Sequence, residues 1–329
     1  MRRKNRSRPV EVSVVTRAVV AKSSGILLQT FGNPLIRKEL RQRMRSVRSI
    51  LALSMYLLAM GAIAFIFMYL NVQGQTLLLQ PTRTAELFTF LSYLQLAMIS
   101  FVTPGIAAGV ISGERERQTL TVLLTTPLTP LTIIVSKWLA SISFLSLLIV
   151  MTLPLYSIVF LFGGVVPSQV IAVFWLQLVT LGAIATISVF WSTFIQRTGW
   201  ATVLSYGTVA VIYILLGIAG YLIDGVAAHN PDASAWTDAA TLCYALNPLF
   251  MLASIVERFG LITPVYHNTL AASLFSSVDA HHLASSGSWF LFLTVYLAGS
   301  VVLLGACAWR LRPGAFSVFM RRLLSWVAR

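Results

Sequence analysis

Charged residues are scarce in this chain. Only 10% of its 329 residues are Asp, Glu, Lys or Arg, whereas 57% are hydrophobic. Soluble domains carry about 25% charged residues, so the composition excludes a water-soluble globular protein. Cysteines are scarce as well, because Cys243 and Cys307 are the only two. They are too few for a disulfide framework.

Six long segments contain no charged residue, and each exceeds the roughly 20 residues that a helix needs to cross the hydrocarbon core of a membrane. Helices are expected there because backbone polar groups find no water in the bilayer. The sequence therefore predicts an all-α polytopic membrane protein, with a transmembrane domain over residues 50–309. Its six transmembrane helices are predicted at residues 50–70, 87–112, 138–162, 170–195, 201–223 and 288–309.

The few charges are distributed unevenly. With both termini in the cytoplasm, 22 of the 24 Lys and Arg lie on the cytoplasmic side, and six of the ten acidic residues lie on the other side. Cytoplasmic loops of membrane proteins are rich in Lys and Arg. We therefore expect a multi-pass protein of the plasma (inner) membrane with cytoplasmic N- and C-termini. The basic pI follows from this topology and does not indicate nucleic-acid binding.

The N-terminal region divides into two parts. Residues 1–32 are predicted to be a basic cytoplasmic tail, because Arg17 and Lys22 interrupt the apolar core that a signal peptide needs. Residues 33–49 open with Asn-Pro, a capping side chain followed by proline at the first helical position. The apolar and basic stripes that follow predict an amphipathic elbow helix in the membrane interface. The charged residues assigned to this helix are Arg37, Lys38, Glu39, Arg41 and Arg45.

Two further regions lie between or after the spans. Residues 224–287 are predicted to be external, as short helices packed on the outer mouth of the bundle, with a helix start at Asn247-Pro248. Their histidines favour solvated side chains over a metal site, so no metal is predicted. Residues 310–329 predict a cytoplasmic amphipathic tail.

The chain lacks the motifs of nucleotide binding and of hydrolysis. It has no G-x-x-x-x-G-K-[ST], no H-E-x-x-H and no G-x-S-x-G. No predicted span holds an acid, base or cation, which ion-coupled transporters usually keep at mid-membrane. We therefore expect neither an enzyme nor a self-powered transporter, and no cofactor bound by this chain. Gln95 and Gln177, two amides within spans, favour hydrogen bonds between helices over lining a path.

The loop at residues 113–137 is the most informative part of the sequence. It opens with GERERQTLTVLLTTPLTP. Glu114 and Glu116 are expected at the start of a short helix, where the helix dipole favours anions. Leucines then offer an apolar ridge, and Thr129-Pro130 is expected to cap the next helix. Such a loop suits the docking of a partner, and the alternative is a charged turn that only obeys the positive-inside rule.

Glycines recur at four-residue spacing where the second span meets this loop. Gly105, Gly109 and Gly113 fall on one face of a helix. Small residues at this spacing allow two helices to approach closely, and chance spacing is the alternative. Pro104 and Pro154 are expected to kink the second and third spans.

Two segments resemble a known family. NPLIRKELRQRMRS, at residues 33–46, resembles the opening helix of permease subunits of type-2 ABC exporters. The 113–130 segment resembles their first cytoplasmic loop, commonly G-E-R-E-x-G-T-L-x-x-L-L-x-T-P. Gln118 stands where that pattern has glycine, and this replacement is expected to stiffen the turn.

The resemblance implies a six-span half-transporter with a coupling helix in this loop. Two permease subunits, identical or not, would pair with two separate ATP-binding cassette ATPase subunits, which bind ATP and Mg. A membrane scaffold or mechanotransmission subunit of an ATPase complex, which moves no substrate, is the alternative. Carried over by residue, the docking element would be Glu114, Arg115, Glu116, Arg117, Thr119, Leu120, Leu123 and Leu124.

Overall fold

Every regular element in the described part of the chain is a helix. The computed structural model describes residues 41, 47–72, 81–120, 129–161, 165–229, 234–258 and 286–311, and no strand occurs among them. The predicted all-α class is thus confirmed. The helices are α3 (Val47–Val72), α4 (Pro81–Ala107), α5 (Gly109–Glu116), α7 (Pro130–Met151), α8 (Leu153–Leu161), α9 (Pro167–Phe194), α10 (Thr198–His229), α11 (Ser234–Ala245), α12 (Pro248–Arg258) and α15 (Ser286–Arg310).

The chain is a multi-pass membrane protein. Within the described residues, five helical segments are long and apolar enough to cross a membrane: Ala85–Glu116, Pro130–Ser157, Pro167–Phe194, Thr198–Ala227 and Ser288–Arg310. α3 adds a shorter apolar stretch, Leu53–Tyr69, within a helix of 26 residues. We take α3 as the first of six spans, because its full length exceeds the roughly 20 residues that a span needs.

Prolines accompany breaks in the second and third spans. Proline lacks a backbone N–H, and its ring clashes with the carbonyl four residues earlier. Pro104 lies inside α4, and the helix is interrupted at Ala108, between α4 and α5. Thr152 separates α7 from α8, and Pro154 is the second residue of α8. The second and the third span therefore each consist of two helical segments joined at one residue.

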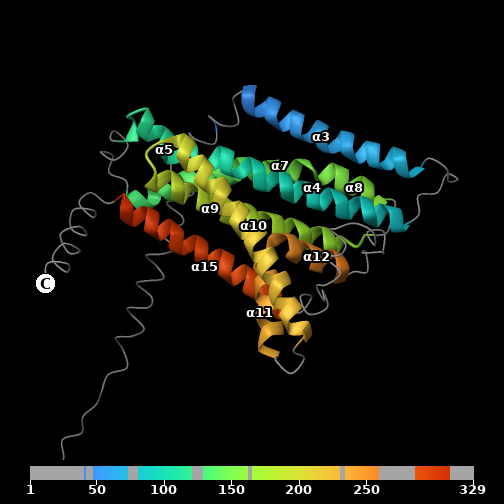
Figure 1. Cartoon of the computed structure of the whole chain (residues 1–329). Coiled ribbons are helices and arrows are strands. Elements are labelled where there is room, and N and C mark those ends of the chain that lie inside the picture. The colour runs from blue at the N-terminus through green and yellow to red at the C-terminus, as the bar shows by residue number, and fades with distance from the viewer. Residues whose placement is uncertain are drawn as a thin grey trace, which may run out of the picture.

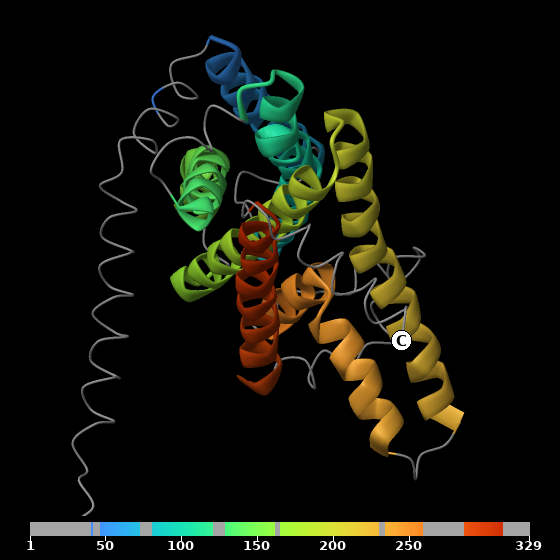
Figure 2. The ribbon, with the colours of Figure 1, turned by 90° about the vertical axis from the view of Figure 1, so that its left-hand side faces the viewer.

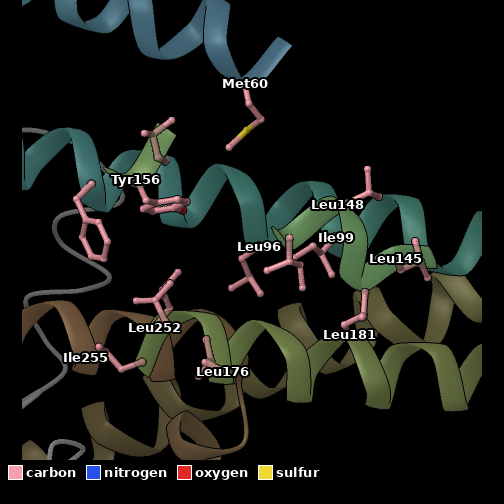
Figure 3. Packing of buried hydrophobic residues seen from close by; sticks show 14 of the residues in the cluster. Met60, Leu96, Ile99, Leu145, Leu148, Tyr156, Leu176, Leu181, Leu252 and Ile255 are labelled. Carbon is pink, nitrogen blue, oxygen red and sulfur yellow. The ribbon is translucent and has the colours of Figure 1, made fainter. Parts of the chain in front are cut away.

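The main hydrophobic core lies around α9. Leu96 of α4, Leu145 of α7 and Leu181 of α9 are buried there, and Figure 3 shows their side chains between the ribbons of these helices. Met60 reaches this core from α3, which lies along the outside of the bundle in Figure 1. Leu252 of α12 closes the core from the opposite side. α9 is thus the element on which the other spans are assembled.

α11 and α12 form a bent pair, with an angle of 96° between them. Asn247 begins α12 as expected, because its Oδ1 accepts from the Leu249 N–H (3.1 Å). Its amide Nδ2 donates to the Tyr213 carbonyl of α10 (2.8 Å). The sequence predicts short helices packed on the outer mouth of the bundle here, and Met251, Leu252 and Ile255 of α12 belong to the main core. The pair is apolar enough to be a broken span or a re-entrant loop.

α10 and α15 leave most of their surface uncovered. In the most apolar 18-residue stretch of each helix, only 11% is buried, against 50–56% in three of the other spans. Figures 1 and 2 show α10 running beside α11, away from α3. Their apolar faces are therefore available to lipid or to another membrane subunit.

Close packing between α10 and α11 makes Gly220 a sensitive position. A Cβ there would lie 2.6 Å from Cε1 of Tyr244, whose ring packs on Phe250 at 4.8 Å between centroids. We expect Gly220→Ala to lower stability by about 1–3 kcal/mol, the usual cost of overpacking. A Cβ at Gly207 of α10 would meet no atom within 4 Å, so Gly207→Ala is the matched control.

The measurement is the melting temperature of each variant in detergent. Gly220→Ala should melt lower than the parent, whereas Gly207→Ala should melt at the same temperature or slightly higher, because alanine is the better helix former. Equal melting temperatures for the two variants would contradict the packing of α10 against α11.

Candidate partner-docking site

The charged residues of the predicted docking loop lie at the end of α5. The sequence suggested that Glu114 and Glu116 start a short helix, but α5 spans Gly109–Glu116 and places both in its last turn. The reason is that α5 continues the second span beyond the break at Ala108, so the chain is already helical when it reaches these residues. The helix dipole disfavours anions at this end, and each carboxylate has a compensating partner.

Glu114 joins α5 to the third span. Its Oε1 accepts from Lys137 Nζ of α7 at 2.5 Å. The Lys137 side chain is buried, with 4% of its surface exposed, whereas Glu114 keeps 29%. A cation taken out of water needs such a partner, and removing one member of a buried pair is strongly destabilising. Lys137 is therefore a site residue that the docking motif alone does not indicate.

Arg115 joins α5 to the fourth span. Its guanidinium donates to the carbonyls of Thr193 (3.1 Å) and Ile195 (3.4 Å). These carbonyls belong to the end of α9, where the last carbonyls of a helix have no partner within the helix. A cation is also favoured there by the helix dipole. Arg115 therefore caps α9 from another helix.

Glu116 joins α5 to the fifth span. Its Oε1 accepts from the backbone N–H of Thr198 at 2.7 Å, and Thr198 is the first residue of α10. The first N–H groups of a helix lack partners, and an anion near them is stabilising. Glu116 thus caps α10 across 82 residues of sequence.

The remaining residues of the predicted docking element differ in exposure. Arg117, Gln118 and Thr119 are exposed. Leu120, expected on an apolar ridge, is 8% exposed and packs in a cluster with Ile111, Ile134 and Cys307, among others. Leu123 and Leu124 lie outside the described residues. Within the described part of the loop, the surface open to a partner thus consists of Glu116 and the turn after α5.

The three glycines of the second span all face α10. A Cβ at Gly105 would lie 3.0 Å from Tyr206 Oη, and one at Gly109 would lie 3.3 Å from Thr198 Cγ2. At Gly113 the nearest atom is Thr198 Oγ1, at 3.9 Å. The stripe therefore points at a neighbouring helix and not at lipid. How much this approach contributes to stability stays a prediction.

The elbow helix falls almost wholly outside the described residues. Arg41 alone of its assigned residues is described, and it is helical and exposed. Arg37, Lys38, Glu39 and Arg45 lie outside, so the interfacial position of this helix stays a prediction.

The amides within the spans bond across helices. Gln95 of α4 donates to Thr152 Oγ1 (2.8 Å) and accepts from Tyr156 Oη (2.7 Å). Gln177 of α9 donates to the Ser92 carbonyl (3.4 Å). Both glutamines have no exposed surface. Bonds of this kind contribute about 0.6 kcal/mol on average in a membrane. Those of Gln95 hold the broken third span to α4, and that of Gln177 holds α9 to α4.

Two negative expectations concern the described residues alone. No group of three or more His, Cys, Asp or Glu side chains there is placed to hold a metal ion. Cys243 and Cys307 are both free.

The family of the chain follows from its sequence match over most of its length. The family model described as ABC-2 family transporter protein matches residues 34–322. The chain belongs to the ABC-2 transporter family. No curated protein matches the chain. The family agrees with the multi-pass helical fold, and it makes this chain a transmembrane permease subunit of an ABC transporter.

The ABC-2 permease turns sharply after α5. The Thr119 N–H donates to the Glu114 carbonyl (2.9 Å), and the Gln118 N–H donates to the Arg115 carbonyl (3.1 Å). This pair of bonds is a Schellman motif, whose turning residue is left-handed and is usually glycine. Gln118 occupies that position with φ 58°. The glycine in the family's loop pattern therefore has a conformational reason, and Gln118 carries strain.

Replacing Gln118 with glycine should relieve this strain. A non-glycine residue in the left-handed region costs about 1 kcal/mol or more, so Gln118→Gly should raise the melting temperature in detergent. Gln118→Val should lower it, because a β-branched side chain fits that region worst. A lower melting temperature for the glycine variant than for the parent would show that the turn is unstrained.

Proposed function

We propose that this chain is the membrane-spanning permease subunit of an ATP-driven ABC exporter, powered by a separate ATP-binding subunit docked on the 113–130 loop. Membership of the ABC-2 family supports it, since the match covers residues 34–322. The observation that carries the proposal is the triple anchorage of α5. Glu114, Arg115 and Glu116 tie this helix to α7, α9 and α10.

This anchorage suits the transmission of force. A docking element that was held only by flexible loops would move without moving the spans. α5 is continuous with the second span except at Ala108, and it bonds directly to the ends of three more. Packed helices respond to a displaced neighbour as rigid units, because protein interiors are dense and compress little. A load on the turn after α5 would therefore reach four of the six spans.

The partner-facing surface should centre on Arg117. It is exposed, and it follows three charged residues that bond within this chain. Arginine is enriched at protein interfaces because its planar guanidinium recognises carboxylates in a bidentate manner. The ATP-binding subunit would supply ATP and Mg, and this chain would bind neither.

The proposed assembly also contains a second permease subunit, either a copy of this chain or a related one. In this assembly the present chain would lie in the plasma membrane, with both of its termini in the cytoplasm. The charge distribution supports this orientation, and Arg115, Lys137, Arg197 and Arg310 all lie at the α5 end of the bundle. The uncovered faces of α10 and α15 leave room for a neighbouring subunit.

Charge reversal at Arg117 tests the docking surface. Arg117→Glu should weaken co-purification with a co-expressed ATP-binding cassette subunit by about ten-fold or more, because like charges facing each other across an interface cost several kcal/mol. The melting temperature of the permease alone should stay unchanged. Arg197→Gln is the control, since Arg197 is exposed at the same end in the α9–α10 turn and this change places no anion beside Glu116.

Two results would count against this proposal. One is undiminished co-purification of Arg117→Glu; the other is an equal loss in both variants, which would indicate general electrostatic attraction. Glu116 makes a poor probe, because reversing its charge would also remove the cap of α10.

A further inference from the structure

The start of α5 has no capping side chain of its own. Ala108 precedes the helix in helical conformation and makes no side-chain cap. The first N–H groups of any helix need partners from outside it, and in a membrane protein an unsatisfied group costs several kcal/mol. Ile111 and Ser112 are fully buried, so water does not satisfy their N–H groups.

Ser192 of α9 supplies the missing cap. Its Oγ accepts from the N–H of Ile111 and from the N–H of Ser112, each at 2.9 Å. The Ser192 hydroxyl then donates to Ser112 Oγ (3.2 Å), which itself donates to the Ala108 carbonyl (2.9 Å). One side chain from another helix thus provides the hydrogen-bond acceptor for two backbone N–H groups just after the break between α4 and α5.

The capping is reciprocal. α9 caps the start of α5 through Ser192, and α5 caps the end of α9 through Arg115, which bonds the Thr193 and Ile195 carbonyls. α5 also caps the start of α10 through Glu116. Three helix ends therefore depend on one another's side chains, and none of these bonds involves the body of α4.

At its start, α5 joins α4 through an interrupted stretch of helix. Pro104 has no N–H to donate to the preceding turn, and the helix is interrupted at Ala108. The Ala108 N–H bonds the Pro104 carbonyl at 3.0 Å. The chain between α4 and α5 is thus interrupted at one residue, whereas Ser192, Arg115 and Glu116 tie α5 to α9 and α10.

We propose that α5 and the adjoining ends of α9 and α10 form one rigid capping clamp, hinged on α4 at residues 104–108, with Ser192 as its positioning residue. This role rests on the proposed function: the clamp delivers a push from the docked ATPase to α9 and α10. Ser192 lies inside the clamp, away from the ATPase, and acts only by holding α5 in place.

Amide hydrogen exchange on the full chain in lipid nanodiscs tests the clamp. Ser192→Ala should speed exchange at Ile111 and Ser112 by about five-fold or more, the factor that matches loss of a typical helix cap. Ser188→Ala is the matched control. Ser188 lies one turn earlier on α9, is equally buried and bonds the Ile184 carbonyl of its own helix, so this variant should leave both amides unchanged.

A remote amide distinguishes a clamp from a local cap. The Thr198 N–H is held by Glu116 of α5 and not by Ser192. If the clamp is one unit, Ser192→Ala should also speed exchange at Thr198, whereas Ser188→Ala should not. Faster exchange confined to Ile111 and Ser112, or equal effects of the two variants, would overturn the proposal.

The link to ATP is tested in the complex with the ATP-binding subunit. Adding ATP and vanadate should change exchange at Thr198 in the parent, and Ser192→Ala should abolish that change while nucleotide still binds. A nucleotide response that persists in Ser192→Ala would refute transmission through the clamp. Failure of the ATPase to bind the parent would instead refute the proposed function, because the exchange measurements on the chain alone need no partner.

Discussion

The structure depends on one constraint: helix ends that lie close to the hydrocarbon must find partners for their backbone groups within the chain. At the α5 end of the bundle, three helix ends meet that constraint together. Ser192 caps α5, Arg115 caps α9 and Glu116 caps α10. The same bonds that give the backbone groups their partners also fix the position of α5. One set of contacts therefore both completes the helix ends and holds the docking element rigid.

This arrangement changes how the charged loop motif is understood. Alternating acids and bases before a turn suggest a surface prepared for a partner, yet the first three bond to neighbouring spans of the same chain. Glu114 neutralises the buried Lys137, and the next two residues cap neighbouring spans. Among the described residues of the motif, the turn that follows, with Arg117, is exposed and makes none of these inter-helix bonds. The motif therefore combines assembly of the permease with its docking, and a variant at one of its charges tests both roles unless the fold is measured separately.

The sequence predicts the all-α, multi-pass fold, because a charge-free run of this length has one physical explanation. It also predicts the breaks near Pro104 and Pro154 and the caps at Thr129 and Asn247, since these features are local. It misplaces the acids of α5, because nothing local shows that the helix resumes after Ala108.

The bonds of the capping clamp are beyond sequence reasoning, since each joins residues about 80 positions apart.

The most direct test of the account is photo-crosslinking from position 117 in native membranes, in the presence of the ATP-binding subunit. A crosslinker at position 117 should capture that subunit, and one at position 225, exposed in the last turns of α10, should not. Capture from position 225 but not from position 117 would contradict both the docking site and the orientation of the chain in the membrane.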